Sequence, residues 1–135
     1  MSLSFIHDFQ NKIYSSLSLD AKIMNIVQKI YIGTIQDGKA PFLLINIVKA
    51  DDLSIHKNAL YSVEFQILAF AKDTNHNLLV SLSDLIIQNL SNINSLFNEY
   101  SIEGIKANNI SFDKAKDLVL NRLVINYKSF IRRGV

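Results

Sequence analysis

The chain has 135 residues, no cysteine, 49% apolar and 19% charged residues, and a formal net charge of +2. This length predicts one domain over residues 1–135, with a core large enough to fold without disulfides or bound metal. The absence of cysteine excludes disulfides and thiolate metal sites. The charged fraction is below the usual value of about 25%, which indicates apolar surface that a partner would cover.

The first 27 residues predict a helix followed by a shorter helical piece. Apolar side chains recur every four positions on one face of the first helix: Phe5, Phe9, Ile13 and Leu17. Ser2 or Ser4 could cap this helix. Asp20 is a favourable N-cap for the second piece. Its inward-facing residues would then be Ile23, Met24 and Val27.

Two strands are expected next. The segment KIYIGTI, with Ile30, Ile32 and Ile35 around Gly33, reads as a short strand, and Asp37-Gly38 is a turn signal. Pro41 lacks an N–H, so it fits the first residue of a strand rather than its middle. The run Phe42–Val48 is nearly all apolar, which predicts a central strand covered on both faces.

A polar stretch over residues 51–59 predicts a loop that joins two antiparallel strands. The strand after it alternates between an apolar set (Tyr61, Val63, Phe65, Ile67, Ala69) and a polar set (Ser62, Glu64, Gln66). A period of two predicts one buried face and one face that is either wet or at an interface. Leu68 and Phe70 interrupt the polar face, so we expect cover near that end.

A long helix should follow, because Asp73, Thr74 or Asn75 can accept hydrogen bonds from the free N–H groups of its first turn. We expect about 20 residues, which is long enough to cover a sheet. The apolar stripe comprises Leu78 or Leu79, Leu82, Leu85 or Ile86, Leu90, Ile93 and Phe97.

The remainder predicts a short strand over YSIEGIKA, a turn at Asn108-Asn109 and a polar stretch from Asp113 to Asp117. The last strand is LVLNRLVINYKSFI, and Arg132-Arg133-Gly134 would trail off as a mobile end. The order of elements predicts an α+β two-layer domain. Its sheet would be mainly antiparallel or mixed, with helices packed on one face.

The residues show no constellation typical of catalysis. The three histidines, His7, His56 and His76, lie far apart and have no second ligand at metal spacing. Asp51-Asp52 lacks the alternating oxygen ligands of a calcium loop. Four glycines form no phosphate-binding loop, and no serine lies in a GxSxG motif. We therefore expect no enzyme activity, no metal and no cofactor, although paired carboxylates that meet only in space stay open.

Charge is uneven along the chain. Residues 51–103 hold seven acidic residues and two lysines, whereas residues 114–135 hold six basic residues and one aspartate. This asymmetry fits ordinary surface variation, or it fits a basic end of one subunit meeting an acidic face of its neighbour. Basic and aromatic residues near the C-terminal end also permit nucleic-acid binding. The small net charge favours a solvated strand end or a subunit contact over sequence-specific binding.

No targeting segment is expected. His7 and Asp8 interrupt any apolar run at the start, so this segment is unlike a signal peptide. The longest apolar stretch, Pro41–Val48, contains Asn46 and is too short to span a membrane. These features predict a soluble, cytoplasmic protein without a membrane partner.

The ordered pattern resembles the tail-completion (tail-terminator, head–tail joining) proteins of long-tailed phages and phage-derived gene transfer agents. The amphipathic FIHDFQNKIYSSL and LDAKIMNIVQKIYIG resemble a leading helix, then a short helix and a strand ending in Ile-Tyr. APFLLINI resembles a Pro-aromatic strand, and ALYSVEFQILAFAKD resembles a long alternating strand. NLLVSLSDLIIQNL resembles the helix of small and aliphatic residues, and DLVLNRLVINYKSFIRR the closing strand with a basic end. The resemblance covers about residues 5–133, and the Asn- and Ser-rich stretch 92–114 departs from it.

The resemblance implies a subunit of a homo-oligomeric ring, commonly a hexamer, that caps the tail tube. Its implied partners are the major tail tube protein and the head–tail connector, with assembly in the cytoplasm before the ring joins a particle. It implies no active site and no cofactor. Five residues are candidates for the subunit or tail interface: Glu64, Gln66, Lys128, Arg132 and Arg133.

Two other hypotheses stay open beside this assembly role. A small ligand-binding or regulatory α+β module would show a concave pocket with converging polar groups. An enzyme would show clustered titratable residues with shifted pKa values.

Overall fold

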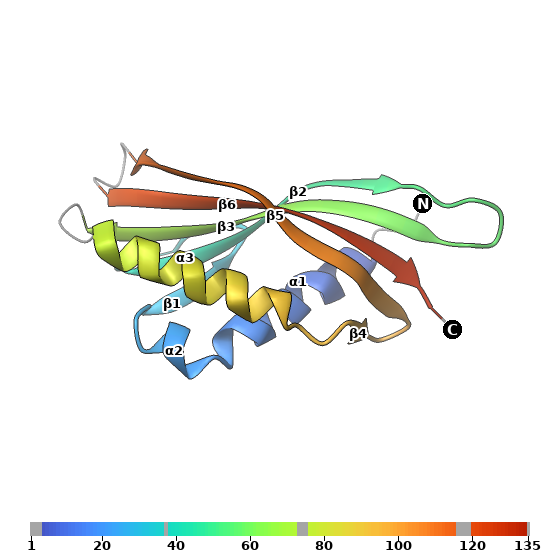
Figure 1. The fold of residues 1–135 in the computed structure, drawn as a ribbon, viewed down its shortest axis with the longest axis horizontal. Coiled ribbons are helices and arrows are strands. Elements are labelled where there is room, and N and C mark those ends of the chain that lie inside the picture. Colours follow the sequence, from blue (N-terminus) through green and yellow to red (C-terminus); the bar gives the residue numbers. More distant parts are fainter. Residues whose placement is uncertain (1–3, 37, 73–75, 116–119, 135) are drawn as a thin grey trace.

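The computed structural model describes residues 4–36, 38–72, 76–115 and 120–134. It has two layers, a curved six-stranded sheet and three helices that pack against one face of that sheet (Figure 1). This arrangement confirms the predicted α+β class with a mixed sheet.

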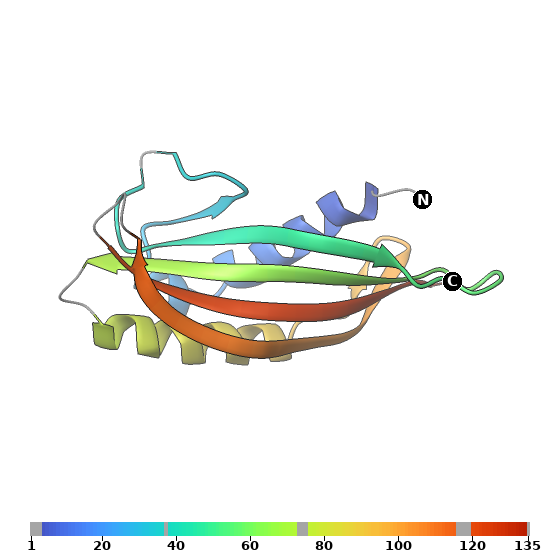
Figure 2. The same ribbon diagram turned by 90° about the horizontal axis from the view of Figure 1, so that it is seen from above.

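The sheet has the strand order β1-β2-β3-β6-β5-β4 (Figure 2). Its strands are β1 (Lys29–Ile32), β2 (Phe42–Asp52), β3 (Leu60–Lys72), β4 (Leu96–Phe97), β5 (Tyr100–Ala115) and β6 (Leu120–Arg133). β1 runs parallel to β2, and all other neighbours are antiparallel. The hairpin between β2 and β3 extends beyond the helical layer at the end where both termini lie (Figure 1).

The helices are α1 (Ser4–Ser18), α2 (Ala21–Met24) and α3 (His76–Ser91). The residues predicted for the inner face of α1 are all buried: Phe5, Phe9, Ile13 and Leu17. Asp20 caps α2, because its Oδ1 accepts hydrogen bonds from the N–H groups of Lys22 and Ile23 at 2.9 and 3.4 Å. Both N-terminal predictions are confirmed.

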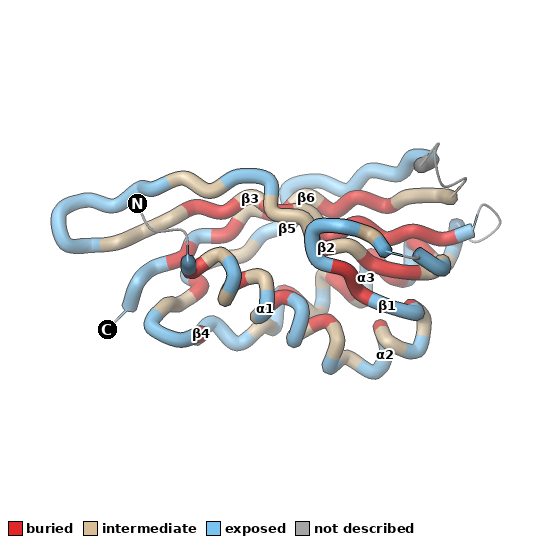
Figure 3. Tube along the Cα trace, turned by 180° about the vertical axis from the view of Figure 1, so that it is seen from behind, coloured by how far each residue is buried: buried red, intermediate tan, exposed pale blue. Residues whose placement is uncertain are grey.

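The main core lies between the helices and the sheet. Figure 3 shows buried segments along the strands and along the helices. Phe65 is at the centre of this core. Its ring meets Phe9 edge to face with centroids 5.4 Å apart and stacks on Tyr127 with centroids 4.9 Å apart. The predicted inward set of β3 is therefore correct in register, with Val63, Phe65, Ile67 and Ala69 buried.

The Tyr127 hydroxyl is buried in this core and has no hydrogen-bond partner among the described residues. Burial raises the pKa of Tyr127 well above its ordinary value, since the phenolate would lie in apolar surroundings. A buried polar group without a partner costs about 1–3 kcal/mol. We therefore expect Tyr127→Phe to keep the free energy of unfolding or raise it, by up to about 2 kcal/mol. Denaturant unfolding measures this, and a clear loss of stability in the variant would contradict it.

A smaller apolar cluster covers one end of the opposite sheet face. It contains Tyr31, Phe42, Leu68, Phe70 and Val124, and the side chains of Ile35, Ala40, Leu44 and Leu120 pack against it. This cluster confirms the cover predicted for Leu68 and Phe70. Gly38 packs tightly here, because a Cβ at this position would come within 2.7 Å of Ile35 Cγ2.

The prediction for the second strand is correct only in its first half. Residues 42–45 pair with β1 and are well covered, whereas Val48 is 56% exposed. β2 also continues to Asp52, so the connecting loop is shorter than the polar stretch suggested. An apolar run predicts a strand but does not fix where a neighbouring strand ends.

The C-terminal predictions need two corrections. β5 continues through Asn108-Asn109, where the pairing with β6 shifts between Ala107 and Asn109. A β-bulge at this point accommodates one extra residue in β5, so the strand continues where the composition predicts a turn. Arg132 and Arg133 belong to β6 rather than to a mobile end, and the Arg133 N–H donates to the carbonyl oxygen of Ala59 at 3.0 Å.

The long helix ends at Ser91, which makes it shorter than expected. Its buried stripe contains Leu79, Leu82, Ser83, Ile86 and Leu90. The Ser83 hydroxyl donates to the Val80 carbonyl oxygen at 2.7 Å, which explains how a serine fits there. Phe97 lies in β4 instead of the helix. The proposed capping residues 73–75, the turn residue Asp37 and the end of the polar stretch at Asp117 lie outside the described residues.

Candidate interaction surface

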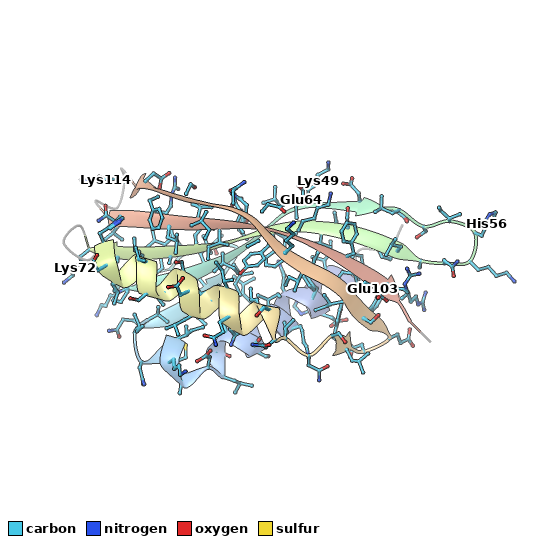
Figure 4. The ribbon with its side chains drawn as sticks, in the orientation of Figure 1. Lys49, His56, Glu64, Lys72, Glu103 and Lys114 are labelled. Carbon is cyan, nitrogen blue, oxygen red and sulfur yellow. The ribbon has the colours of Figure 1, made fainter. Side chains whose placement is uncertain are left out.

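The sheet face opposite the helices, here called the open face, carries most of the polar side chains of the strands. Alternate residues of β2, β3, β6 and β5 point to this side, since successive side chains of a strand alternate between faces. Figure 4 shows Lys49 and Glu64 on this side of the sheet, away from the helices. The polar part of the open face begins where the small apolar cluster ends.

Four amide side chains form a continuous hydrogen-bonded row across the open face. The Asn46 Nδ2 donates to Gln66 Oε1 at 3.2 Å, the Gln66 Nε2 donates to Asn126 Oδ1 at 2.9 Å, and the Asn126 Nδ2 donates to Asn109 Oδ1 at 2.6 Å. The four residues lie opposite one another in register on β2, β3, β6 and β5. We call this row the amide ladder. Hydrogen bonds between side chains across strands stabilise the paired strands.

A charged row lies beside the amide ladder. Register aligns Lys49, Glu64, Lys128 and Lys106 across the same four strands. Lys106 and Lys128 lie directly opposite each other, an arrangement of like charges that is unfavourable in a sheet. Among the described residues, neither lysine has an acidic side chain within ion-pair distance, although Lys128 lies over the Phe130 ring. This row therefore has a surplus of positive charge.

The arginines of β6 bind acidic residues of the neighbouring chain segment. Arg132 pairs with Glu103 at 3.2 Å and Arg133 with Glu99 at 3.2 Å. Part of the charge asymmetry along the sequence is thus neutralised within a single chain. Both pairs are about half exposed or more, so each contributes little to stability.

At the other end of β6, Arg122 donates two hydrogen bonds to Asp113, at 2.7 and 2.6 Å. These bonds lower the pKa of Asp113 and raise the pKa of Arg122, because each charged form stabilises the other. The pair fixes the end of β5 against β6, at the end of the sheet opposite the hairpin.

Four of the five predicted interface residues share the open face. Glu64 and Gln66 come from β3, and Lys128 and Arg132 come from β6. Arg133 follows Arg132 directly in β6, so its side chain points to the opposite face of the sheet from the open face. Their role at an interface stays a prediction.

Sequence reasoning missed Asn46, Asn126 and Asn109 as members of one row. The sequence does contain one signal for this row, which is a single amide residue in the middle of each strand pattern. Asn46 interrupts the apolar run of β2, and Asn126 lies on the polar side of β6. The sequence does not align this row, because Asn108-Asn109 is a turn signal by composition and the bulges in β2 and β5 shift the register.

A cavity of about 340 Å³ lies between α3 and the turn from α1 to α2, and bears on the ligand-binding hypothesis. Its lining is Ser16, Asp20, Lys22, Leu85, Gln88, Asn89 and Asn92. The Asn89 Nδ2 donates to the Ser16 carbonyl oxygen at 2.9 Å and to Asp20 Oδ2 at 3.0 Å, and Ser16 Oγ donates to Asn89 Oδ1 at 2.6 Å. These polar groups therefore join α1 to α3.

The shifted pKa values have local structural causes. Hydrogen bonds from Ser54 lower the pKa of Asp52, and the other shifts belong to the Asp113–Arg122 pair and to buried Tyr127. Within the described ranges, no three His, Asp or Glu residues cluster in a way that could hold a metal ion. In the same residues, no helix is both long and apolar enough to cross a membrane.

The fold is similar to that of solved structures. Among 27 matching chains is a chain of the virion of a native gene transfer agent particle, with a TM-score of 0.75 and 13% sequence identity. The match covers 97% of this chain and 99% of that chain. No protein-family model matches the sequence, and no curated protein matches it. At this identity the likeness establishes the fold.

Proposed function

We propose that this chain is a structural subunit of a phage or phage-like particle, in which it forms a ring that terminates the tail tube and joins it to the head connector. The observation that carries the proposal is the fold match, which extends over nearly the full length of both chains and involves a component of a gene transfer agent virion. The ordered sequence motifs support the tail-terminating role within such a particle. The resemblance implies a hexamer.

The surface of the molecule is compatible with an assembly role. The open face presents the amide ladder and, beside it, the charged row with its surplus of lysines. Large apolar side chains are also exposed at separate places, including Leu53 and Ile55 in the β2–β3 hairpin, Leu96 in β4 and Phe112 in β5. Single exposed apolar side chains are common on protein surfaces, so these residues are compatible with subunit contacts without pointing to one. The subunit would assemble in the cytoplasm and then remain in the particle.

Purified particles from a strain that encodes the chain test this function. We expect the chain to be present in the particles at a fixed ratio to the tail tube protein. Deletion of its gene should give tails of abnormal length, or tails that are not joined to heads, as seen by negative-stain electron microscopy. Particles that lack the chain, with normal joined tails after the deletion, would contradict the proposal and favour a separate regulatory module.

A further inference from the structure

The basic and aromatic residues near the C-terminal end fall into two groups in the structure. Tyr127 is buried, and Arg132 and Arg133 are bound by glutamate side chains. Lys128 and Phe130 lie on the open face instead, where Phe130 is 37% exposed. This second group is therefore accessible to a ligand that approaches the open face.

Lys128 is one of two lysines that oppose each other without a compensating charge. Lys106 of β5 lies directly opposite it in register, and directly opposed side chains have Cβ atoms about 4.5–5.5 Å apart. In the part of the chain that the structure describes, no carboxylate is within ion-pair distance of either ammonium group. An anion bound at both ammonium groups would relieve their mutual repulsion.

Acidic side chains nearby do not neutralise this pair. Asp51 and Glu103, in the adjoining rows of the sheet, form ion pairs with other basic residues. Glu64 lies opposite Lys128 on the β3 side, but it is outside ion-pair distance. The uncompensated positive charge of the open face is thus concentrated on β5 and β6.

A hydrogen-bond donor of the amide ladder lies in the next row. The Asn109 Oδ1 accepts from Asn126 at 2.6 Å, whereas no acceptor for the Asn109 Nδ2 is found among the described residues. The bulge between Ala107 and Asn109 keeps both Lys106 and Asn109 on the open face. The surface here presents two ammonium groups and an amide N–H, which fits a ligand rich in oxygen acceptors.

An exposed aromatic ring adjoins the lysines on the other side. The Lys128 Nζ lies 5.6 Å from the centroid of the Phe130 ring. Gly104 is opposite Phe130 on β5, and a Cβ at Gly104 would meet no atom within 4 Å. The space beside the ring is therefore open to a flat group. We call Lys106, Lys128, Asn109 and Phe130 the lysine patch.

From these contacts we infer that the lysine patch binds single-stranded nucleic acid without sequence preference, with a backbone phosphate at Lys106 and Lys128 and a base stacked on Phe130. Lysine and asparagine side chains are among those that contact phosphate oxygens in nucleic-acid complexes. Every base has a π-face, so stacking on an aromatic ring does not select a sequence. An acidic protein segment would use the lysines and leave the ring unused. The inference goes beyond the proposed function and does not depend on it.

Fluorescence anisotropy of a labelled single-stranded oligodeoxynucleotide of mixed sequence and about 16 nucleotides tests the site. We expect the full chain to bind this probe in about 50 mM salt. Two lysine–phosphate contacts on a single strand predict a salt slope of about −1.4, which is a loss of affinity of about sevenfold between 50 and 200 mM salt.

Two lysine variants separate binding from folding. Lys106→Gln/Lys128→Gln should weaken binding by about tenfold at low salt and bring the salt slope close to zero. Lys106→Gln alone should weaken binding and yet keep or raise the melting temperature, because it removes the repulsion between opposed lysines. A lysine with only a structural role would not give this combination.

Phe130→Leu tests the stacked base. The variant should bind the single strand about fivefold more weakly or worse, since stacking on an aromatic ring contributes strongly for each base. Its salt slope should stay as in the wild type, because the lysine–phosphate contacts remain.

Lys12→Gln/Lys57→Gln is the matched control for charge. It removes the same net charge from α1 and from the β2–β3 hairpin, away from the lysine patch, so it should bind as the wild type does. Circular dichroism verifies that each variant is folded.

Several outcomes would overturn the inference. Absence of binding by the wild-type chain at low salt would do so. Equal loss in the charge control and the double patch variant would reduce the effect to net charge. Unchanged binding by Phe130→Leu, together with equal competition by poly-glutamate, would assign the patch to an acidic protein partner instead. Tighter binding of a duplex than of the single strand would contradict the stacked base.

Discussion

Replacement of Phe65 by aspartate is expected to unfold the protein. Phe65 is 1% exposed and lies between the rings of Phe9 and Tyr127. A carboxylate at this position would have no counter-charge in the core, so it would lose the ring contacts and also carry a desolvation penalty. The combined cost should exceed about 4 kcal/mol, a large part of the total stability of a small domain. Far-UV circular dichroism and thermal unfolding of the purified variant measure the loss.

Glu64→Lys is the matched control one residue away on the same strand. Glu64 points to the open face, where it lies in register between Lys49 and Lys128. The variant should remain folded, with a decrease in the free energy of unfolding of up to about 1 kcal/mol from repulsion between neighbouring lysines. Equal loss of structure in the two variants would show that the assigned faces of β3 are incorrect.

Reversal of the basic end of β6 should have the largest effect on assembly. With Lys128, Arg132 and Arg133 replaced by glutamate, we expect tails of abnormal length or tails that fail to join heads. Exposed ion pairs contribute only about 0–1 kcal/mol each, so the charges would set the register of subunits more than the strength of binding. Electron microscopy of particles that carry the variant gives the readout. Normal particles with a folded variant would mean that the basic end is only a solvated strand terminus.

The internal ion pairs of this region require a further control. Arg132→Glu alone places two carboxylates together at Glu103, which disturbs the subunit itself. The exchange Arg132→Glu/Glu103→Arg keeps an ion pair at the same place and exchanges the positions of its two charges. If assembly depends on a basic side chain at position 132, the exchange should impair particles while thermal stability is retained. Normal particles from the exchange variant would show that Arg132 acts through its ion pair with Glu103, which stabilises the subunit, and not through a contact with another subunit.

Periodicity in the sequence was sufficient to predict the layers of the fold. Four apolar residues at helical spacing identified the buried face of α1, and alternation in β3 placed Phe65 inside and Glu64 outside. The Asp20 cap was also predictable, because an aspartate directly before a short helical pattern is a favourable N-cap. These signals are local, so they do not depend on knowing which strands are neighbours.

The parts that were missed depend on contacts between distant residues. Asn108-Asn109 is a turn signal by composition, but pairing with β6 holds it in a strand with a bulge. Arg132 and Arg133 looked like a loose basic end, but the acidic residues that bind them lie about 30 positions earlier in the chain. The amide ladder requires the register of four strands at once, and local patterns do not provide it.

The amide ladder also determines how the open face responds to solvent. None of its four side chains can gain or lose a proton, so its hydrogen bonds do not depend on pH. The arginine–glutamate pairs at the end of β6 are exposed, and added salt screens them within a Debye length of about 8 Å at physiological ionic strength. A contact through the ladder would therefore persist in concentrated salt, whereas one through the basic end would weaken. Ionic strength thus gives a means to separate the two surfaces without any mutation.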